Sequence, residues 1–337
     1  MSYFFLITID VEDWFQVENF KKYIPFDSWS SYELRVEKNT YRLLDLFDSI
    51  ERKKTEGRMQ NTVSDDENQA SSIKFSDNGQ ELTEDKQNDK VQCTFFVLGW
   101  LAKQLPHLVR EIQSRGHEVA SHGYKHNLCN AQSYKDIKMD LYDSKNLLED
   151  IIGTQVFGYR APSFSINNDI LEIIEECGYL YDSSYNSFSM HGRYGHVDLS
   201  RNEKKGIAIR ISKSLNAERR THTTEPQTFY ELPISNLKLA QQVLPWGGGG
   251  YFRMIPFILF RWGVRSILKK ENAFLFYFHP WEIDPDQPKV DNASKLYKFR
   301  HYLNIGTAYS KLHKFLEICN QCHFVSCRQY VKRVSKD

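Results

Sequence analysis

Length, composition and charge narrow the classes of protein to which this chain can belong. Its 337 residues are enough for one large α/β domain, and 41% of them are hydrophobic, which is enough for a sizeable core. Lys and Arg number 44 against 43 Asp and Glu, so the chain as a whole has no basic field of the kind that attracts nucleic acid or an anionic membrane.

The chain begins directly in an apolar, strand-like run at 3–9, with no basic leader or cleavage site, which predicts a cytoplasmic protein. Two arginines interrupt the apolar stretch 254–267, so we expect no transmembrane helix. Six scattered cysteines favour a reduced compartment. Cys319, Cys322 and His323 match a haem-attachment pattern, but that reaction requires export, and a helix end leading into a strand is the favoured interpretation.

Apolar runs and chain breakers predict strands that alternate with helices. The expected strands are 3–9, 91–98, 118–121, 156–159, 179–181, 207–211, 228–232 and 273–278. The expected helices are 35–50, 100–114, 134–151, 167–177, 255–270 and 307–320. Such alternation is typical of a parallel sheet and predicts an α/β fold, with a β/α barrel as the architecture.

Two polar segments interrupt this pattern. Residues 51–90 are rich in Asp, Glu, Asn, Gln, Ser and Lys, with one aromatic residue, Phe75. Such a segment cannot bury enough apolar surface to offset its ordering entropy, so we predict a disordered insertion. A second polar stretch, 200–227, is expected to be partly ordered.

Polar side chains follow five of the predicted strands. These residues are Asp10, His122, Arg160, Asp182 and His279. In a β/α barrel the carboxyl ends of the strands share one face, where active sites are assembled from several loops. Each residue alone has a bland interpretation as a cap, a salt-bridge partner or a core side chain, but their joint position predicts one site.

The pair His122 and His126, four residues apart, has a spacing that allows both rings to bind one metal ion. A carboxylate from the first strand end, Asp10, Glu12 or Asp13, is the expected third ligand, and a second carboxylate would serve as a base. Asp10 and Glu12 point to one face of an extended segment and Asp13 to the other. The alternative is a pair of surface or capping histidines.

The order of the motifs resembles a known family. The chain resembles the polysaccharide deacetylases with a NodB-type domain, carbohydrate esterase family 4, and looks most like those linked to exosortase (PEP-CTERM) exopolysaccharide loci. The segments that carry the resemblance are 8–15, 94–100, 116–126, 158–165, 181–184, 248–253, 278–284 and 300–304.

The resemblance implies a distorted (β/α) barrel formed by 1–50 and 91–285, with 286–337 as a C-terminal extension packed on it. It implies hydrolysis of the N-acetyl group of N-acetylhexosamine units in an exopolysaccharide or its precursor. A divalent metal is expected, zinc before cobalt, nickel or manganese. The partners would be an N-acetylated glycan and, by association, polysaccharide assembly machinery; nucleic acid is not expected.

The resemblance also implies roles for individual residues. The expected metal ligands are His122, His126 and an acidic residue of the first motif, for which Glu12 is favoured over Asp13. Asp10 matches the base and His279 the acid. The remaining expected roles are orientation of the base by Arg160, support of His279 by Asp182, and substrate binding by Tyr251 and Trp281.

Two alternatives remain open. One is a related metal-dependent amide hydrolase with a small substrate, for which a sealed pocket is expected; an aromatic-lined groove near Trp246, Tyr251 and Trp281 would favour a glycan. The other is a catalytically inactive glycan-binding module on the same fold.

Overall fold

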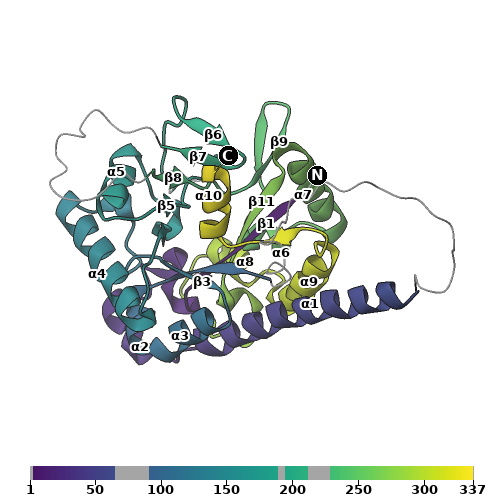
Figure 1. The fold of residues 1–337 in the computed structure, drawn as a ribbon. Coiled ribbons are helices and arrows are strands. Elements are labelled where there is room, and N and C mark those ends of the chain that lie inside the picture. Colours follow the sequence, from purple (N-terminus) through teal and green to yellow (C-terminus); the bar gives the residue numbers. More distant parts are fainter. Residues whose placement is uncertain (1–2, 65–90, 189–193, 212–227, 337) are drawn as a thin grey trace.

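The computed structural model describes residues 3–64, 91–188, 194–211 and 228–336, and side chains in the first range up to residue 50. The main strands are β1 (Phe4–Val11), β2 (Cys93–Val97), β3 (Glu118–Ser121), β4 (Gly158–Tyr159), β5 (Tyr181–Asp182), β8 (Tyr230–Glu231) and β11 (Ala273–Phe278). They form a sheet in the order β11-β1-β2-β3-β4-β5-β8, in which all neighbours are parallel. The sheet curls, and helices cover its outer face (Figure 1), so the predicted α/β fold of distorted-barrel type is confirmed.

Irregular backbone, rather than a further parallel strand, covers the free side of β11. After β8 the chain returns to β11, where the Leu275 N–H donates to Ser235 Oγ at 2.8 Å and the Tyr277 N–H donates to the Gly247 carbonyl at 2.7 Å. A hairpin, β9 (Asn236–Leu239) and β10 (Gln242–Pro245), lies between these two contacts, and the sequence did not predict it. The antiparallel strands β6 (Glu203–Lys205) and β7 (Ala208–Arg210) extend the sheet beyond β8.

The helices are α1 (Val36–Ser64), α2 (Gly99–Gln104), α3 (Pro106–Ser114), α4 (Tyr134–Ile152), α5 (Asn168–Glu176), α6 (Gly249–Met254), α7 (Phe257–Glu271), α8 (Lys295–Tyr302), α9 (Ile305–Ile318) and α10 (Cys327–Lys336). The prediction of one helix at 100–114 was wrong. Pro106 disfavours helical dihedrals at the residue before it, and Leu105 has φ −129° and ψ 57°, so two helices form. Helix α1 continues past the predicted end near residue 50; residues 65–90 of the predicted insertion lie outside the described residues.

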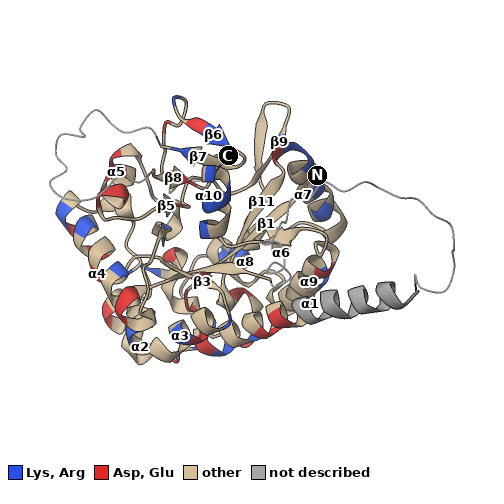
Figure 2. Ribbon diagram, viewed as in Figure 1, with Lys and Arg blue, Asp and Glu red and all other residues tan. Residues whose placement is uncertain are grey.

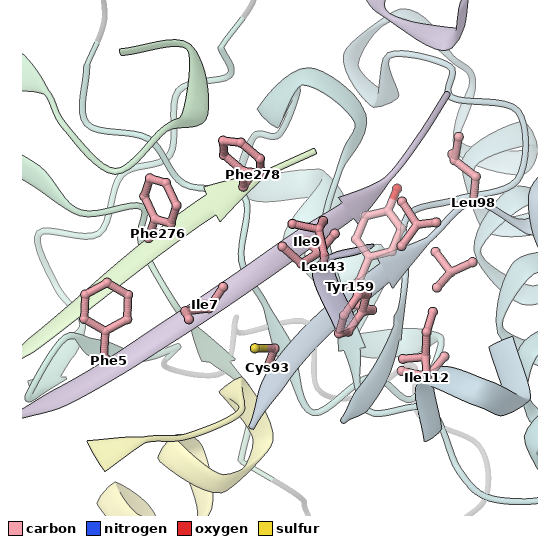
Figure 3. Close-up of a cluster of buried hydrophobic side chains, with 14 of the residues drawn as sticks. Phe5, Ile7, Ile9, Leu43, Cys93, Leu98, Ile112, Tyr159, Phe276 and Phe278 are labelled. Atoms are coloured by element: carbon pink, nitrogen blue, oxygen red, sulfur yellow. The ribbon is translucent and has the colours of Figure 1, made fainter. Parts of the chain in front are cut away.

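Side chains of β1 alternate between the two faces of the sheet, as a strand requires. Phe5, Ile7 and Ile9 face the helices and pack in one cluster with Phe276 and Phe278 of β11 (Figure 3). Full burial of side chains of this size contributes about 1.5–3 kcal/mol each. The side chains between them on β1 point to the barrel interior, which is apolar at Leu6 and polar towards the strand end.

The C-terminal residues are part of the sheet and its cover. β12 (His323–Phe324) pairs with the start of β1, and Phe315 of α9 contacts Phe5 with ring centroids 5.6 Å apart. Cys319 and Cys322 are buried where α9 ends. Among the helices of the described residues, none combines the length and the apolar character needed to span a bilayer.

Candidate active site

Glu12, His122 and His126 bring three ligand atoms together at the carboxyl end of the sheet. Glu12 Oε1 lies 2.9 Å from His122 Nε2 and 3.0 Å from His126 Nε2. All three residues are buried, and their ligand atoms lie within 4.8 Å of one another. Two imidazoles and one carboxylate are a ligand set used by catalytic zinc sites, which leave further positions open for water and substrate.

The protonation pattern of His122 fits a cation in this position. Its Nδ1 lies 2.7 Å from the carbonyl oxygen of Arg160, which can only accept, so Nδ1 carries the proton. In the neutral ring Nε2 then directs a lone pair at Glu12 Oε1, which is also a lone-pair atom. A bound cation removes this conflict, and a backbone carbonyl on the second nitrogen is the usual way to fix a ligand histidine.

A loop, not a helical turn, brings the two histidines together. β3 ends at Ser121, and Gly123 and His126 have φ values of +72° and +54°. A Cβ on Gly123 would lie 2.6 Å from Asp140 Oδ2, the atom that accepts from the Tyr124 N–H at 2.9 Å. Glycine at this position is therefore required by both the backbone conformation and the packing.

Asp10 is held by a fully buried arginine. Arg160 Nη1 donates to Asp10 Oδ1 at 2.7 Å and to Thr8 Oγ1 at 2.7 Å. The rest of the guanidinium donates to the carbonyl and hydroxyl oxygens of Ser183, each at 2.8 Å, and its carbon lies 4.1 Å from the centre of the Phe96 ring. An arginine whose three guanidinium nitrogens all donate hydrogen bonds, and which lies against an aromatic ring, fixes the orientation of the carboxylate it binds.

A buried ion pair between Glu282 and Arg253 fixes the position of His279. Its Nδ1 lies 2.8 Å from Glu282 Oε1, and Glu282 Oε2 accepts from Arg253 Nε at 2.8 Å. Burial opposes protonation of His279, but the Glu282 hydrogen bond and the charges of Glu12, Glu282 and Asp10 prevail and raise its pKa to about 9. The ring is therefore protonated at neutral pH.

The base and acid candidates face each other. His279 Nε2 lies 3.9 Å from Asp10 Oδ2, and both residues line the same cleft as the three ligand candidates. Burial would raise the pKa of Glu12, but the charge of His126 and the close contacts with both imidazoles hold it well below its ordinary value. The site thus combines a cationic acid, a carboxylate and a ligand triad.

Asp182 does not support His279 as predicted. It accepts from Ser184 and lies beside Glu231, its register partner on β8. Tyr181 belongs to the interior cluster, so the next residue along the strand points to the opposite face. Burial raises the pKa of both carboxyls, that of Glu231 strongly because the Asp182 charge adjoins it. Glu282 takes the place expected for Asp182.

Asp13, the open alternative to Glu12, is also outside the site. It accepts from the N–H groups of Trp14, Arg35 and Val36 at 2.7–2.9 Å, which anchors the start of α1. Burial, opposed by these hydrogen bonds, raises its pKa to about 6. Glu12 is therefore the residue of this motif that meets the histidines.

An open cleft leads to the site. Its lining includes Phe164, Tyr194, Tyr277, Trp281 and Arg300. The Trp281 ring lies between two histidine rings, 5.1 Å from His279 and 4.2 Å from His301, nearly parallel to both. Of the other two aromatic residues expected at the groove, Tyr251 contacts Phe188 and is not among the lining residues, and Trp246 is a core residue stacked on Phe260.

Sequence reasoning missed the residues that support the site. Glu282, Arg253 and Ser183 hold the candidate acid and base. All three lie in segments that carry the family resemblance, but no role was predicted for them. One signal was available. Glu282 stands three residues after His279, the spacing of a capping box, and a short helix, Pro280–Ile283, does begin there.

Family models match two adjacent parts of the chain. Residues 80–181 match the family described as polysaccharide deacetylase, and residues 183–332 match a domain of unknown function, DUF3473. This match and the curated relatives described below support a polysaccharide deacetylase domain in this part of the chain. The site spans both matches and the residues before them, because Asp10 and Glu12 precede the first match and His279 lies in the second.

Curated relatives match part of the chain. The peptidoglycan-N-acetylglucosamine deacetylase of Bacillus cereus is 28% identical over 90 residues, 27% of this chain and 42% of that protein. A peptidoglycan deacetylase-like protein of Gibberella zeae is 34% identical over 94 residues, 28% of each chain. The peptidoglycan deacetylase of Helicobacter pylori is 32% identical over 99 residues, 29% of this chain and 34% of that protein. The chain thus spans less than half the length of these relatives.

Two solved structures share the fold across nearly the whole chain. A crystal structure from Mycobacterium smegmatis, provisionally named a polysaccharide deacetylase, aligns with a TM-score of 0.56 and 15% identity over 99% of this chain and 90% of that one. The structure of Puue allantoinase aligns with a TM-score of 0.53 and 11% identity over 98% and 89%.

Proposed function

We propose that this protein is a metal-dependent N-deacetylase that removes acetate from N-acetylhexosamine units of a glycan. The observation that carries the proposal is the ligand triad Glu12, His122 and His126 beside the facing pair Asp10 and His279. A divalent cation held by the triad would polarise the acetyl carbonyl and make water a stronger nucleophile at neutral pH.

The chain's own residues supply the proton transfers. Asp10, oriented by Arg160, accepts the proton of the attacking water. His279, kept protonated by Glu282, donates from Nε2 to the departing nitrogen, which leaves as an amine. Arg160 and Glu282 are positioning residues, because each acts through the side chain it holds. Each proton-transferring group is worth roughly 10²–10⁴-fold in rate.

The cleft favours a sugar over a small amide. It is open, and aromatic rings of Phe164, Tyr194 and Trp281 line it. Relatives named peptidoglycan deacetylase and chitooligosaccharide deacetylase support the glycan class. Within that class we propose an exopolysaccharide or its precursor, on the resemblance of the motifs to deacetylases linked to exosortase loci, and zinc as the metal, on the His-His-carboxylate set.

Acetate release from N-acetylated chitooligosaccharides, with and without a chelator, tests the proposal. We expect release that the chelator stops and added zinc restores, and no release from a His122→Ala variant that unfolds at the same temperature as the wild type. Release that persists in the chelated protein, or in this variant, would contradict the proposal. Hydrolysis of small acetamides without any release from oligosaccharides would overturn the substrate class.

A further inference from the structure

Exposed large apolar side chains gather on α6, α7 and α8. Their exposed fractions are 50% for Met254, 76% for Ile258, 48% for Leu259, 49% for Trp262, 61% for Leu296 and 58% for Phe299. Ile258 and Trp262 are one helical turn apart and lie on one stripe of α7. Large exposed apolar side chains, where they gather on helices that contact one another, mark a place where a protein meets a partner or a membrane.

Cations outnumber acidic residues on this apolar surface. The one acidic residue on α6, α7 and α8 is Glu271, the last residue of α7, which pairs with Lys204 of β6. On α7, Arg265 and Lys269 continue the stripe of Ile258 and Trp262 at the same helical spacing, and both are exposed. Figure 2 shows Lys and Arg gathered on α7. This surface is therefore locally basic, although the total charge of the chain is close to zero.

The buried side chain of Arg253 connects α6 to α8, the two helices that carry Met254 and the exposed pair Leu296 and Phe299. Arg253 of α6 donates to the His301 carbonyl at 2.9 Å and to the Leu303 carbonyl, and its own carbonyl accepts from Asn304 Nδ2 at 2.9 Å. The end of α8 is thus fixed against α6, which the chain joins directly to α7. Arg300, on α8 one residue after Phe299, lines the cleft of the candidate active site. Helix α8 therefore lies beside that cleft.

We propose that the face formed by α6, α7 and α8 docks on the surface of an anionic lipid bilayer. The apolar side chains enter the boundary between headgroups and acyl chains, and the cations meet lipid phosphates. Long Lys and Arg stems allow the charge to reach the headgroups while the neighbouring apolar groups insert. The attachment is peripheral and does not depend on the reaction proposed above.

Flotation of the full chain with vesicles tests this proposal. We expect binding to vesicles of phosphatidylcholine with phosphatidylglycerol, and weak binding to phosphatidylcholine alone. Replacing Ile258, Leu259 and Trp262 by Gln should lower the partition coefficient about 100-fold, from the apolar area that is lost. Replacing Arg265 and Lys269 by Gln should lower it about 25-fold, at about fivefold for each cation, and added salt should have a similar effect.

A matched control is available on α4, where Met139 and Tyr142 are also exposed. Replacing both by Gln should leave vesicle binding unchanged, and all variants should unfold at the wild-type temperature. Equal binding of the α7 variants and the wild type would overturn the proposal. So would a wild-type chain that ignores both kinds of vesicle but forms a dimer that the α7 variants abolish, because the face would then bind a second copy.

Discussion

The Glu282→Gln substitution isolates the part of the site that sets the charge of His279. Glu282 is buried, accepts from Arg253 and contacts His279 Nδ1 at 2.8 Å. Glutamine keeps the shape and can still accept one hydrogen bond, but it removes the negative charge. The variant therefore tests electrostatics with little change in packing.

The size of the effect follows from the shift itself. The pKa of His279 rises from 6.5 to about 9, and at about 1.4 kcal/mol for each unit this is roughly 3–4 kcal/mol of preference for the protonated ring. Burial opposes this preference; Glu282 is its leading source, and Glu12 and Asp10 supply the rest. Neutralising Glu282 should lower the pKa by about one unit or more, and a cation bound at Glu12 lowers it further in both proteins.

The sign of the pH dependence follows from the role of His279 as an acid. Because the protonated ring is the active form, activity is present below the folded-state pKa and is lost as pH rises through it. In the metal-free wild type, NMR titration of the His279 ring should give a midpoint near 9, and in Glu282→Gln a lower one. The pH above which kcat/KM for acetate release declines should also be lower in Glu282→Gln than in the wild type.

The control is a partly exposed His–Glu pair on α9, His313 and Glu317, which does not line the cleft. Glu317→Gln should leave the decline of kcat/KM at high pH unchanged. The prediction is wrong if Glu282→Gln keeps both the wild-type titration midpoint of His279 and the wild-type decline of kcat/KM at high pH. Glu282 would then not stabilise the protonated ring.

Three further changes test other parts of the site. Asp10→Asn should lower kcat by about 10²–10⁴-fold while metal content, measured by elemental analysis, stays constant; normal turnover would rule out Asp10 as the base. His122→Ala should lose the metal from the purified protein, and a full complement of bound metal in it would remove His122 from the ligand set. Gly249→Ala should lower both thermal stability and kcat, because the added Cβ would lie 2.0 Å from Glu282 Oε1; unchanged melting and kinetics would show that Glu282 can move freely.

The sequence predicted the barrel well because its longest strands, β1, β2 and β11, are apolar runs. β3 and β11 have the predicted bounds, and β1 differs by one or two residues at each end. Elements of weak pattern were missed. Helix α6 begins inside a run of glycines, and the strands of the hairpin β9–β10 have four residues each, of which only Leu237 is buried, so neither has the extended pattern that marks a buried face.

The sequence could predict those site residues whose position depends on where a strand ends and on which face of the strand they lie. Asp10, His122, Arg160 and His279 all reach one cleft or the side chains behind it, as their position after strands suggested. The second layer was not predictable in this way, because Glu282 and Arg253 meet through the contact of α6 with a short helix that is far away in the sequence. Only the packing of the barrel end brings them together.

The alternation of side chains between the two faces of each strand explains which strand-end residues enter the site. On β11, Leu275 and Tyr277 face the interior, so His279, two residues further on, faces the interior as well. On β5, Tyr181 faces the interior, which makes Ser183 the next residue to do so and leaves Asp182 on the opposite face beside Glu231. Ser183 accordingly binds Arg160 with both its carbonyl and its hydroxyl oxygen. A polar residue at the end of a barrel strand is thus a site candidate only when it is an even number of residues from a side chain of the interior cluster, because it then points to the same face of the sheet. This rule separates His279 from Asp182, although each lies at the end of its strand.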